Sequence, residues 1–462
     1  MHRATTLLLI FVTGCTGLTL GEQAPDSPKI DVYLESGAIA IDSRTQHVYM
    51  LTKSSNAQDE LGGKLYRASP DSSTPSLVKD LRGMTDLRML FPASGILLMA
   101  EDGDLNDSLT LLDHRSLMVK KERSFEVKFH GSRLSGSGRY LAVADNTSEA
   151  SPIMVFDTET LESITIPHDG QQLEAMWSNQ GDILLAVVGY NPLSEDASAR
   201  FLAWDFSKTS PLLQLTDPAG KLWANPLFDL SAEHATMDFF FSFSWVGVSP
   251  DDRYAVFPML LVSNTTPEGP EPTLNYDHLL YVVDLATGNM RTVMNAKGPV
   301  GFSADSSAIV SYRENGSNTD ILLVDVDDLS ENTVELDYSG PQFFITREGN
   351  VLVIAPTNDD AQGLVLHDLN SGESRFVEGP SLQLNHFTSR VGANELWIID
   401  EGVHRLDFVA NQLETINLDW TPSSVNYLAA RDLLVFNDTQ SPRFVFWSPT
   451  ERSITRSVPI LD

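Results

Sequence analysis

The sequence has a single cysteine, few basic residues and no helical periodicity, and each shortage excludes a class of protein. Cys15 is the only cysteine, so the mature chain forms no internal disulfide and its fold must rest on buried apolar surface. Only 31 Lys and Arg residues face 63 Asp and Glu residues, and the net charge of −32 repels phosphate backbones. We therefore expect no nucleic-acid partner. The lack of helical spacing among apolar residues argues against a helical solenoid.

Motifs of known chemistry are also missing. No two histidines stand two or four residues apart, and the His-Glu-x-x-His pattern of zinc hydrolases does not occur. There is no Gly-x-Ser-x-Gly nucleophile turn and no glycine-rich phosphate loop. We identify no catalytic residue, and the only cofactor that the sequence suggests is the calcium ion considered below.

The first residues have the pattern of an export signal. Met1-His2-Arg3 is a short basic segment, and the apolar run from Leu7 to Val12 is too short to span a bilayer. Val12-Thr13-Gly14-Cys15 resembles the lipobox of bacterial lipoproteins, in which the cysteine is lipidated after cleavage. The resemblance implies a signal peptide at residues 1–14, lipidation at Cys15 and a flexible tether through residue 30. Thr16 stands where an aspartate would imply inner-membrane retention, which favours the outer membrane, at its periplasmic face or at the cell surface.

The rest of the chain repeats one pattern of β-strands. A polar turn leads into an apolar strand, and a second strand follows and ends in an aspartate. The distance from the turn to this aspartate is 22 residues in three copies, Ser135 to Asp157, Ser303 to Asp325 and Thr346 to Asp368. The strand-ending aspartates recur roughly 40 to 48 residues apart with one longer gap, and they are Asp113, Asp157, Asp205, Asp284, Asp325, Asp368 and Asp407. This spacing is typical of β-propeller blades.

The spacing predicts one all-β domain over residues 31–460, a propeller of four-stranded antiparallel blades. Seven aspartates mark seven units, and residues 36–80 and 424–458 look like two more. Because propellers usually have four to eight blades, we expect eight within a range of seven to nine, with strands from both ends sharing one blade. Ser249-Pro250-Asp251-Asp252 resembles the turns of the TolB-like and WD40-like (YVTN-type) propellers of bacterial envelopes. The resemblance implies the fold and a scaffolding role, and no particular chemistry.

Two groups of residues are candidate sites. Asp102, Asp104 and Asp107 lie in an acidic turn that could supply oxygen ligands to Ca²⁺, although the spacing of an EF-hand is absent. An insertion at about residues 215–240 interrupts the repeat, and from it we select Trp223, Glu233 and His234 as ligand or partner contacts beside the channel mouth. A second insertion at 263–277 is rich in proline and is expected to be a loop. The strand-ending aspartates are expected to cap backbone N–H groups.

These features favour a monomeric envelope lipoprotein, held to the membrane by its lipid anchor alone, whose propeller binds a protein or small ligand. Two alternatives remain open. Convergent side chains at one channel mouth would favour an enzyme, such as a lactonase, a glycan lyase or hydrolase, or a quinoprotein-like oxidoreductase. Stabilisation by Ca²⁺ would favour a calcium-dependent binding module.

Overall fold

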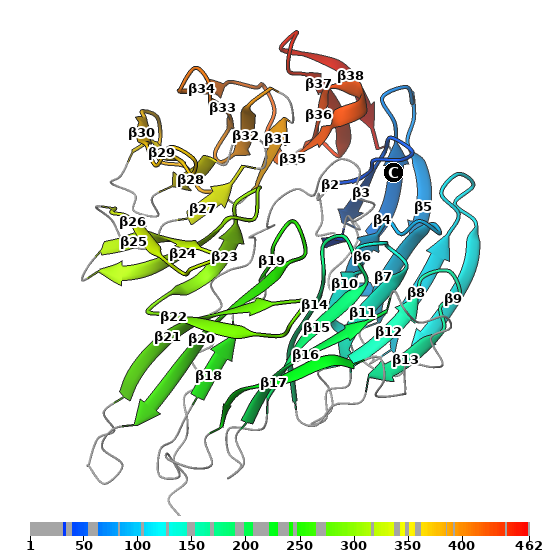
Figure 1. Cartoon of the computed structure of the whole chain (residues 1–462). Helices are drawn as coiled ribbons and strands as arrows, with labels where there is room; N and C mark the ends of the chain where they lie inside the picture. Colours follow the sequence, from blue (N-terminus) through cyan, green and yellow to red (C-terminus); the bar gives the residue numbers. More distant parts are fainter. Residues whose placement is uncertain are drawn as a thin grey trace, which may run out of the picture.

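A computed structural model describes most of the chain beyond residue 30. The described residues are 31–33, 39–53, 63–81, 84–102, 106–125, 129–145, 153–166, 171–189, 198–206, 221–229, 240–243, 247–264, 274–315, 318–336, 342–346, 351–355, 362–384, 386–390, 393–438 and 441–460. They form nine antiparallel sheets that follow one another along the chain. Figure 1 shows these sheets arranged as the blades of a ring, with the last blade beside the first.

The first three blades form as follows. Blade 1 contains β2 (Ile39–Asp42), β3 (His47–Lys53), β4 (Gly63–Ala68) and β5 (Ser76–Asp80). Blade 2 contains β6 (Met84–Leu90), β7 (Ile96–Asp102), β8 (Asn106–Leu112) and β9 (Val119–Phe125), with β1 (Asp31–Tyr33) added to β6. Blade 3 contains β10 (Phe129–Leu134), β11 (Tyr140–Asp145), β12 (Ile153–Asp157) and β13 (Ser163–Ile166).

The middle blades include the two with the longest strands. Blade 4 contains β14 (Gln171–Trp177), β15 (Ile183–Gly189), β16 (Ser198–Asp205) and β17 (Lys221–Asp229). Blade 5 contains β18 (Phe240–Phe243) and β19 (Gly247–Val248), which both pair with β20 (Tyr254–Asn264), then β21 (Leu274–Asp284) and β22 (Met290–Met294). Blade 6 contains β23 (Lys297–Phe302), β24 (Ala308–Asn315), β25 (Asn318–Asp325) and β26 (Glu331–Val334).

The last three blades are regular and short-stranded. Blade 7 contains β27 (Gln342–Ile345), β28 (Val351–Ala355), β29 (Leu364–Asp368) and β30 (Ser374–Val377). Blade 8 contains β31 (His386–Arg390), β32 (Glu395–Ile399), β33 (Val403–Asp407) and β34 (Gln412–Ile416). Blade 9 contains β35 (Pro422–Leu428), the 3₁₀ helix η3 (Ala429–Arg431), β36 (Leu433–Asp438), β37 (Arg443–Ser448) and β38 (Ser453–Pro459). In the described part of the chain, no helix is long and apolar enough to cross a bilayer.

The core is divided among the spaces between blades. Nine clusters of buried apolar side chains occur, and each joins one blade to the next around the ring. The cluster that closes the ring contains Ile39 and Met50 from blade 1 with Phe444 and Phe446 from blade 9. Each blade has apolar side chains on both faces, and each face needs a neighbouring blade to cover it. The sheets are therefore stable only as a ring.

The propeller prediction is confirmed, and its blade count is nine, the upper end of the expected range. The two ends of the chain do not share a blade, contrary to our expectation. Each terminal segment has four strands of its own, and the ring closes by packing instead of by a mixed sheet. Polar contacts support this closure, since Asn426 Nδ2 donates to the carbonyl of Ile39 at 2.9 Å and Arg431 pairs with Asp71 at 2.7 Å.

Buried hydroxyl groups explain why the turn before the second strand repeats. In five blades, a serine or threonine at the end of the first strand accepts a hydrogen bond from the backbone N–H five residues later, where the second strand begins. These residues are Ser135, Ser178, Ser249, Ser303 and Thr346, at N to O distances of 2.9–3.2 Å. All five are buried, so the hydroxyl satisfies an N–H group that water cannot reach.

Candidate functional site

The two faces of the ring differ in their connections. One face, here called the turn face, carries the turns from first to second strand and from third to fourth strand in each blade. The opposite face, here called the hairpin face, carries the turns between second and third strands and the connections between blades. The two faces therefore present different kinds of surface to a partner.

Among the described residues, blade 5 has the longest strand pair on the hairpin face. β20 and β21 pair over eleven residues, up to the pair Asn264 and Leu274, whereas β22 reaches only as far as Leu279. The hairpin therefore extends five residues beyond β22, or about 16 Å. β17 of blade 4 is also long, and a shared apolar cluster packs blade 4 against blade 5. We call these strand ends the raised edge, and Figure 1 shows them at the lower left.

The raised edge shows where the expected insertions lie. Within residues 215–240 the structure describes Lys221–Asp229, which forms β17 as the outer strand of blade 4, and Phe240, which begins β18 of blade 5. Trp223 lies in this strand, paired in register with Ala203 of β16. Glu233 and His234 lie outside the described residues, as does Cys15. Of the second insertion, Ser263 and Asn264 end β20 and Leu274 to Asp277 begin β21, so these ends are strand and not loop as expected, and 265–273 lie outside the described residues.

The acidic turn lies at the β7–β8 hairpin of blade 2, also on the hairpin face. Asp102 ends β7 and pairs in register with Asn106, Asp107 is buried in β8, and Asp104 is outside the described residues. In the described part of the chain, no group of three or more His, Cys, Asp or Glu side chains could hold a metal ion. The calcium site stays a prediction, because the central residue of the turn is not described.

The recurring aspartates have the structural role that their position predicts. Six of them accept hydrogen bonds through one carboxylate oxygen from the backbone N–H groups two and three residues later, at 2.8–3.2 Å. They are Asp113, Asp157, Asp284, Asp325, Asp368 and Asp407. Each closes the turn between the third and fourth strands of its blade, so these carboxylates stabilise the turn face.

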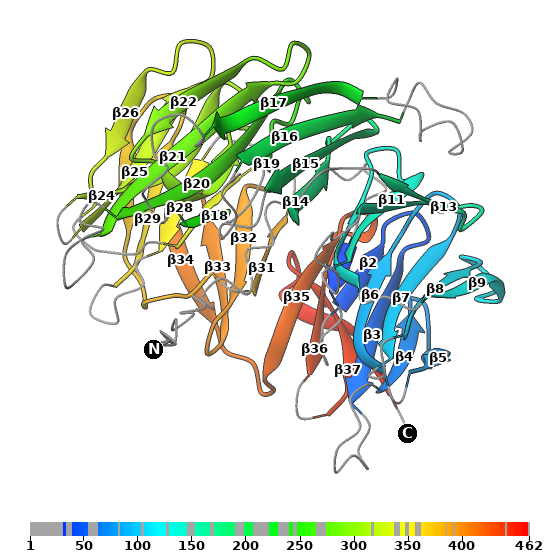
Figure 2. The same ribbon diagram turned by 90° about the horizontal axis from the view of Figure 1, so that it is seen from below.

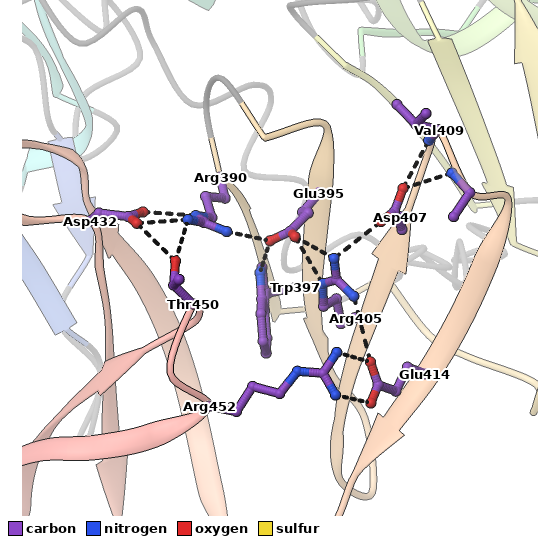
Figure 3. Close-up of polar contacts among 11 residues, drawn as sticks. Arg390, Glu395, Trp397, Arg405, Asp407, Val409, Glu414, Asp432, Thr450 and Arg452 are labelled. Atoms are coloured by element: carbon purple, nitrogen blue, oxygen red, sulfur yellow. Dashed lines mark hydrogen bonds and ion pairs between the residues drawn. The ribbon is translucent and has the colours of Figure 1, made fainter.

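A charged cluster joins blades 8 and 9 at the turn face (Figure 3). Glu395 accepts hydrogen bonds from Arg390, Arg405 and the indole N–H of Trp397, and its side chain is only 7% exposed. Arg390 also binds both carboxylate oxygens of Asp432 on blade 9, at 2.7 and 2.6 Å. These contacts make one continuous chain of charges across the boundary between the two blades.

The same cluster continues on the outer side of blade 8. Arg452 of blade 9 binds both carboxylate oxygens of Glu414, at 2.8 and 2.9 Å, and Arg405 lies 3.5 Å from the same carboxylate. Every charged group in Figure 3 has a partner of opposite charge. The hydrogen bond to Asp432 raises the pKa of Arg390, although burial acts in the opposite direction. Since each charged group is paired with one of opposite charge, the cluster fastens the two blades together.

A second polar cluster lies between blades 1 and 2. The buried carboxylate of Asp42 accepts hydrogen bonds from the hydroxyl of Thr45 at 2.8 Å and from the backbone of Arg44, and it lies 3.4 Å from His114. Burial would raise the pKa of Asp42, but the contacts with His114, Thr45 and Arg44 outweigh it and lower the pKa to about 2. Arg44 also donates to the carbonyl of Pro92 in blade 2 at 2.7 Å, so this cluster also joins neighbouring blades.

Sequence reasoning did not find either cluster. Asp42 and His114 are 72 residues apart along the chain and Arg390 and Asp432 are 42 apart, and no spacing in the sequence links either pair. The chain brings them together only because neighbouring blades place equivalent turns side by side. The signal that could have found them is the concentration of arginine near turns, which is too weak to interpret alone.

Fold and turns define this protein as a β-propeller with nine blades. No family model matches the chain, and no curated protein matches it. Among solved structures it is similar to the Dos1 propeller, at 13% identity over 80% of this chain and 92% of that chain, with a TM-score of 0.48. It is also similar to Porphyromonas gingivalis dipeptidyl peptidase 4, at 10% identity over 92% of this chain and 60% of that chain, with a TM-score of 0.48. It is similar as well to dihydro-heme d1 dehydrogenase NirN, at 12% identity over 79% of this chain and 73% of that chain, with a TM-score of 0.45. The likeness concerns the fold alone.

Proposed function

We propose that this chain is a lipoprotein of the bacterial envelope, anchored through Cys15, whose propeller is a rigid scaffold that binds a protein or small ligand. The observation that carries the proposal is the contrast between the two faces. On the turn face, the recurring aspartates close turns, and the Glu395 and Asp42 clusters link neighbouring blades. On the hairpin face, the β20–β21 hairpin of blade 5 extends five residues beyond β22. A rigid ring with one raised edge suits presentation of a binding surface.

The raised edge can be tested by shortening it without removing a strand of the core. Replacing residues 265–273 by Asn-Gly joins Asn264 to Leu274, which already pair in register, through a two-residue turn. A matched control replaces residues 103–105 by Asn-Gly between the register partners Asp102 and Asn106. Affinity capture from envelope extract should lose a partner with the first variant only. If both variants captured the same proteins as the wild type, or if both lost the same partner, a binding role for the raised edge would be contradicted.

The anchor has a separate test. Cells expressing the wild-type chain and grown with labelled palmitate should incorporate label, and the Cys15→Ala variant should incorporate none and leave the membrane fraction. Absence of label from the wild type, or membrane retention of Cys15→Ala, would refute the lipoprotein proposal and leave the scaffold test unaffected.

A further inference from the structure

The position of β1 shows where the N-terminal segment enters the ring. β6 is the first strand of blade 2, and β1 pairs antiparallel with its free edge on the inner side of the sheet. Asp31 pairs with Leu90, the last residue of β6 and the one nearest the turn face, while Tyr33 pairs with Arg88. β1 therefore begins at the turn-face end of blade 2. Cys15 precedes Asp31 by 16 residues, at most about 55 Å of extended chain.

The charge of the chain is divided very unequally around the ring. Residues 39–166, which form blades 1 to 3, contain 14 Lys and Arg against 18 Asp and Glu, a net charge of −4. Residues 167–462, which include blades 4 to 9, contain 15 against 41, a net charge of −26. An anionic surface therefore repels one side of the ring much less than the other.

The outer edge of blade 2 combines basic and apolar side chains. All residues of β9 from Val119 to Ser124 are exposed, and the preceding turn exposes 71% of Met118. Glu122 pairs with Lys79 at 3.2 Å and Asp113 pairs with Lys120 at 3.3 Å, so the two carboxylates of this edge are neutralised. We define the blade 2 edge by these residues and the remaining cations beside them: Lys79, Asp113, Arg115, Met118, Val119, Lys120, Lys121, Glu122 and Arg123. It has five cations and two carboxylates, and the exposed Glu159 and Glu162 of blade 3 lie beside it, next to the carbonyls that Lys121 and Arg123 contact.

From these observations we infer that the turn-face end of the blade 2 edge rests against the anionic lipid surface to which the chain is tethered. This inference builds on the anchor proposed above. Met118 and Val119 enter the interfacial region, the neighbouring cations contact lipid phosphates, and blades 4 to 9 are tilted away from the membrane. The raised edge, on the opposite face, then points toward the surrounding solution, where a partner can reach it.

Screening allows this orientation in a chain of net charge −32. At about 0.1 M salt the Debye length is about 10 Å, which is shorter than the width of a sheet of four strands at about 4.8 Å spacing. The acidic blades across the ring therefore repel the lipid surface only weakly. Each Lys or Arg near an anionic leaflet strengthens binding about fivefold, so the cations of this edge that carboxylates do not neutralise favour this orientation.

Two exposed methionines provide a test that needs no substitution. Met118 lies at the turn face of blade 2 and is 71% exposed, whereas Met294 ends the outer strand of blade 5 at the hairpin side and is 52% exposed. The unacylated mature chain is coupled through Cys15, its only cysteine, to a maleimide lipid in vesicles of phosphatidylethanolamine and phosphatidylglycerol. Peroxide oxidation of both methionines is followed by mass spectrometry, with the uncoupled chain as reference. Because coupling replaces acylation, failure of this test is independent of whether cells lipidate Cys15.

We expect oxidation of Met118 to be severalfold slower on vesicles, with the rate at Met294 unchanged. Protection of Met294 alone, equal protection of both residues or no protection of either would overturn the orientation. Lys121→Glu changes the charge by two units and should weaken binding of the uncoupled chain to these vesicles roughly 25-fold. Arg375→Glu makes the same charge change on β30, the exposed outer strand of blade 7, and should have little effect. Equal effects of the two variants on vesicle binding would contradict the role of the blade 2 edge. If this edge bound a protein partner instead of lipid, neither variant would change vesicle binding, and the inference would be overturned.

Discussion

At the scale of single residues, the turns of this propeller depend on buried oxygen atoms that accept backbone hydrogen bonds. Ser303 shows the arrangement: its hydroxyl accepts the N–H of Ala308 at 2.9 Å and donates to Asp305 at 2.7 Å. In blade 7 the same position is occupied by Thr346, which accepts the N–H of Val351. The chemistry that matters is therefore the hydroxyl group, and the extra methyl group of threonine is tolerated in at least one blade.

Ser303→Ala should lower the free energy of unfolding by about 1 to 2 kcal/mol, because it leaves a buried N–H without its partner. Ser303→Thr keeps the hydroxyl and should lose less. Urea unfolding of the two variants beside the wild type measures the difference. If alanine were tolerated as well as threonine, the hydrogen bond would not be what holds this turn.

Asp42 predicts a stability that depends on pH. Its folded pKa of about 2 lies below the usual pKa of an aspartate, about 3.9, so the stability that its charge contributes is present above about pH 4 and is lost as the pH falls through 2. The shift corresponds to about 2 kcal/mol for this buried carboxylate. Asp42→Asn should lose about this much at neutral pH and little at pH 2. Unfolding curves across this range test the prediction, and a difference between variant and wild type that does not shrink with acid would refute it.

At the scale of elements, neighbouring blades are joined by polar clusters as well as by apolar faces. The Glu395 cluster crosses from blade 8 to blade 9, and the Asp42 cluster crosses from blade 1 to blade 2. The two kinds of contact have different consequences, because apolar faces pack in many ways whereas a paired carboxylate and guanidinium require one geometry. We infer that these clusters define the angle between neighbouring blades.

Glu395→Gln should destabilise the protein by about 2 to 4 kcal/mol, because it leaves Arg390 and Arg405 partly buried without their shared carboxylate. Glu414→Gln is the matched control, since it removes a carboxylate from the same cluster at a position that is 38% exposed. Its cost should stay below about 1 kcal/mol. Denaturant unfolding measures both values, and equal costs would mean that burial does not decide the contribution of this cluster.

At the scale of the whole molecule, the ring is closed by apolar packing between its first and last blades (Figure 2). Separate sheets at the two ends leave the closing boundary without shared backbone hydrogen bonds of a mixed blade. The stability of this boundary therefore depends on contacts between side chains. Phe446 is the residue chosen to test it, because it is fully buried between blades 9 and 1.

Phe446→Ala should lower the free energy of unfolding by about 3 to 5 kcal/mol, through lost burial and the cavity that remains. Phe376→Ala removes the same ring from a position that is 56% exposed and should change stability by less than about 0.5 kcal/mol. Thermal and denaturant unfolding compare the two variants. A small effect at Phe446 would show that the closing boundary contributes little to stability.

The amino-acid sequence by itself determined the four-stranded blade, the repeated turns and the all-β propeller class. Strand-ending aspartates and turn serines act on N–H groups two to five residues away, so their spacing is visible along the chain. Both terminal segments were recognised as blade-like for the same reason. Their assignment to separate blades was not, because a ring of eight and a ring of nine use the same local pattern.

Tertiary structure alone decided the number of blades, the manner of closure and the polar clusters. These depend on contacts between residues as far apart as Asn426 and Ile39, and such contacts leave no spacing in the sequence. It also placed Trp223 within an outer strand and packed blade 4 against blade 5. The physical reason is the range of the interactions: backbone capping is local, whereas the packing of one blade against another is determined only when the whole ring is assembled.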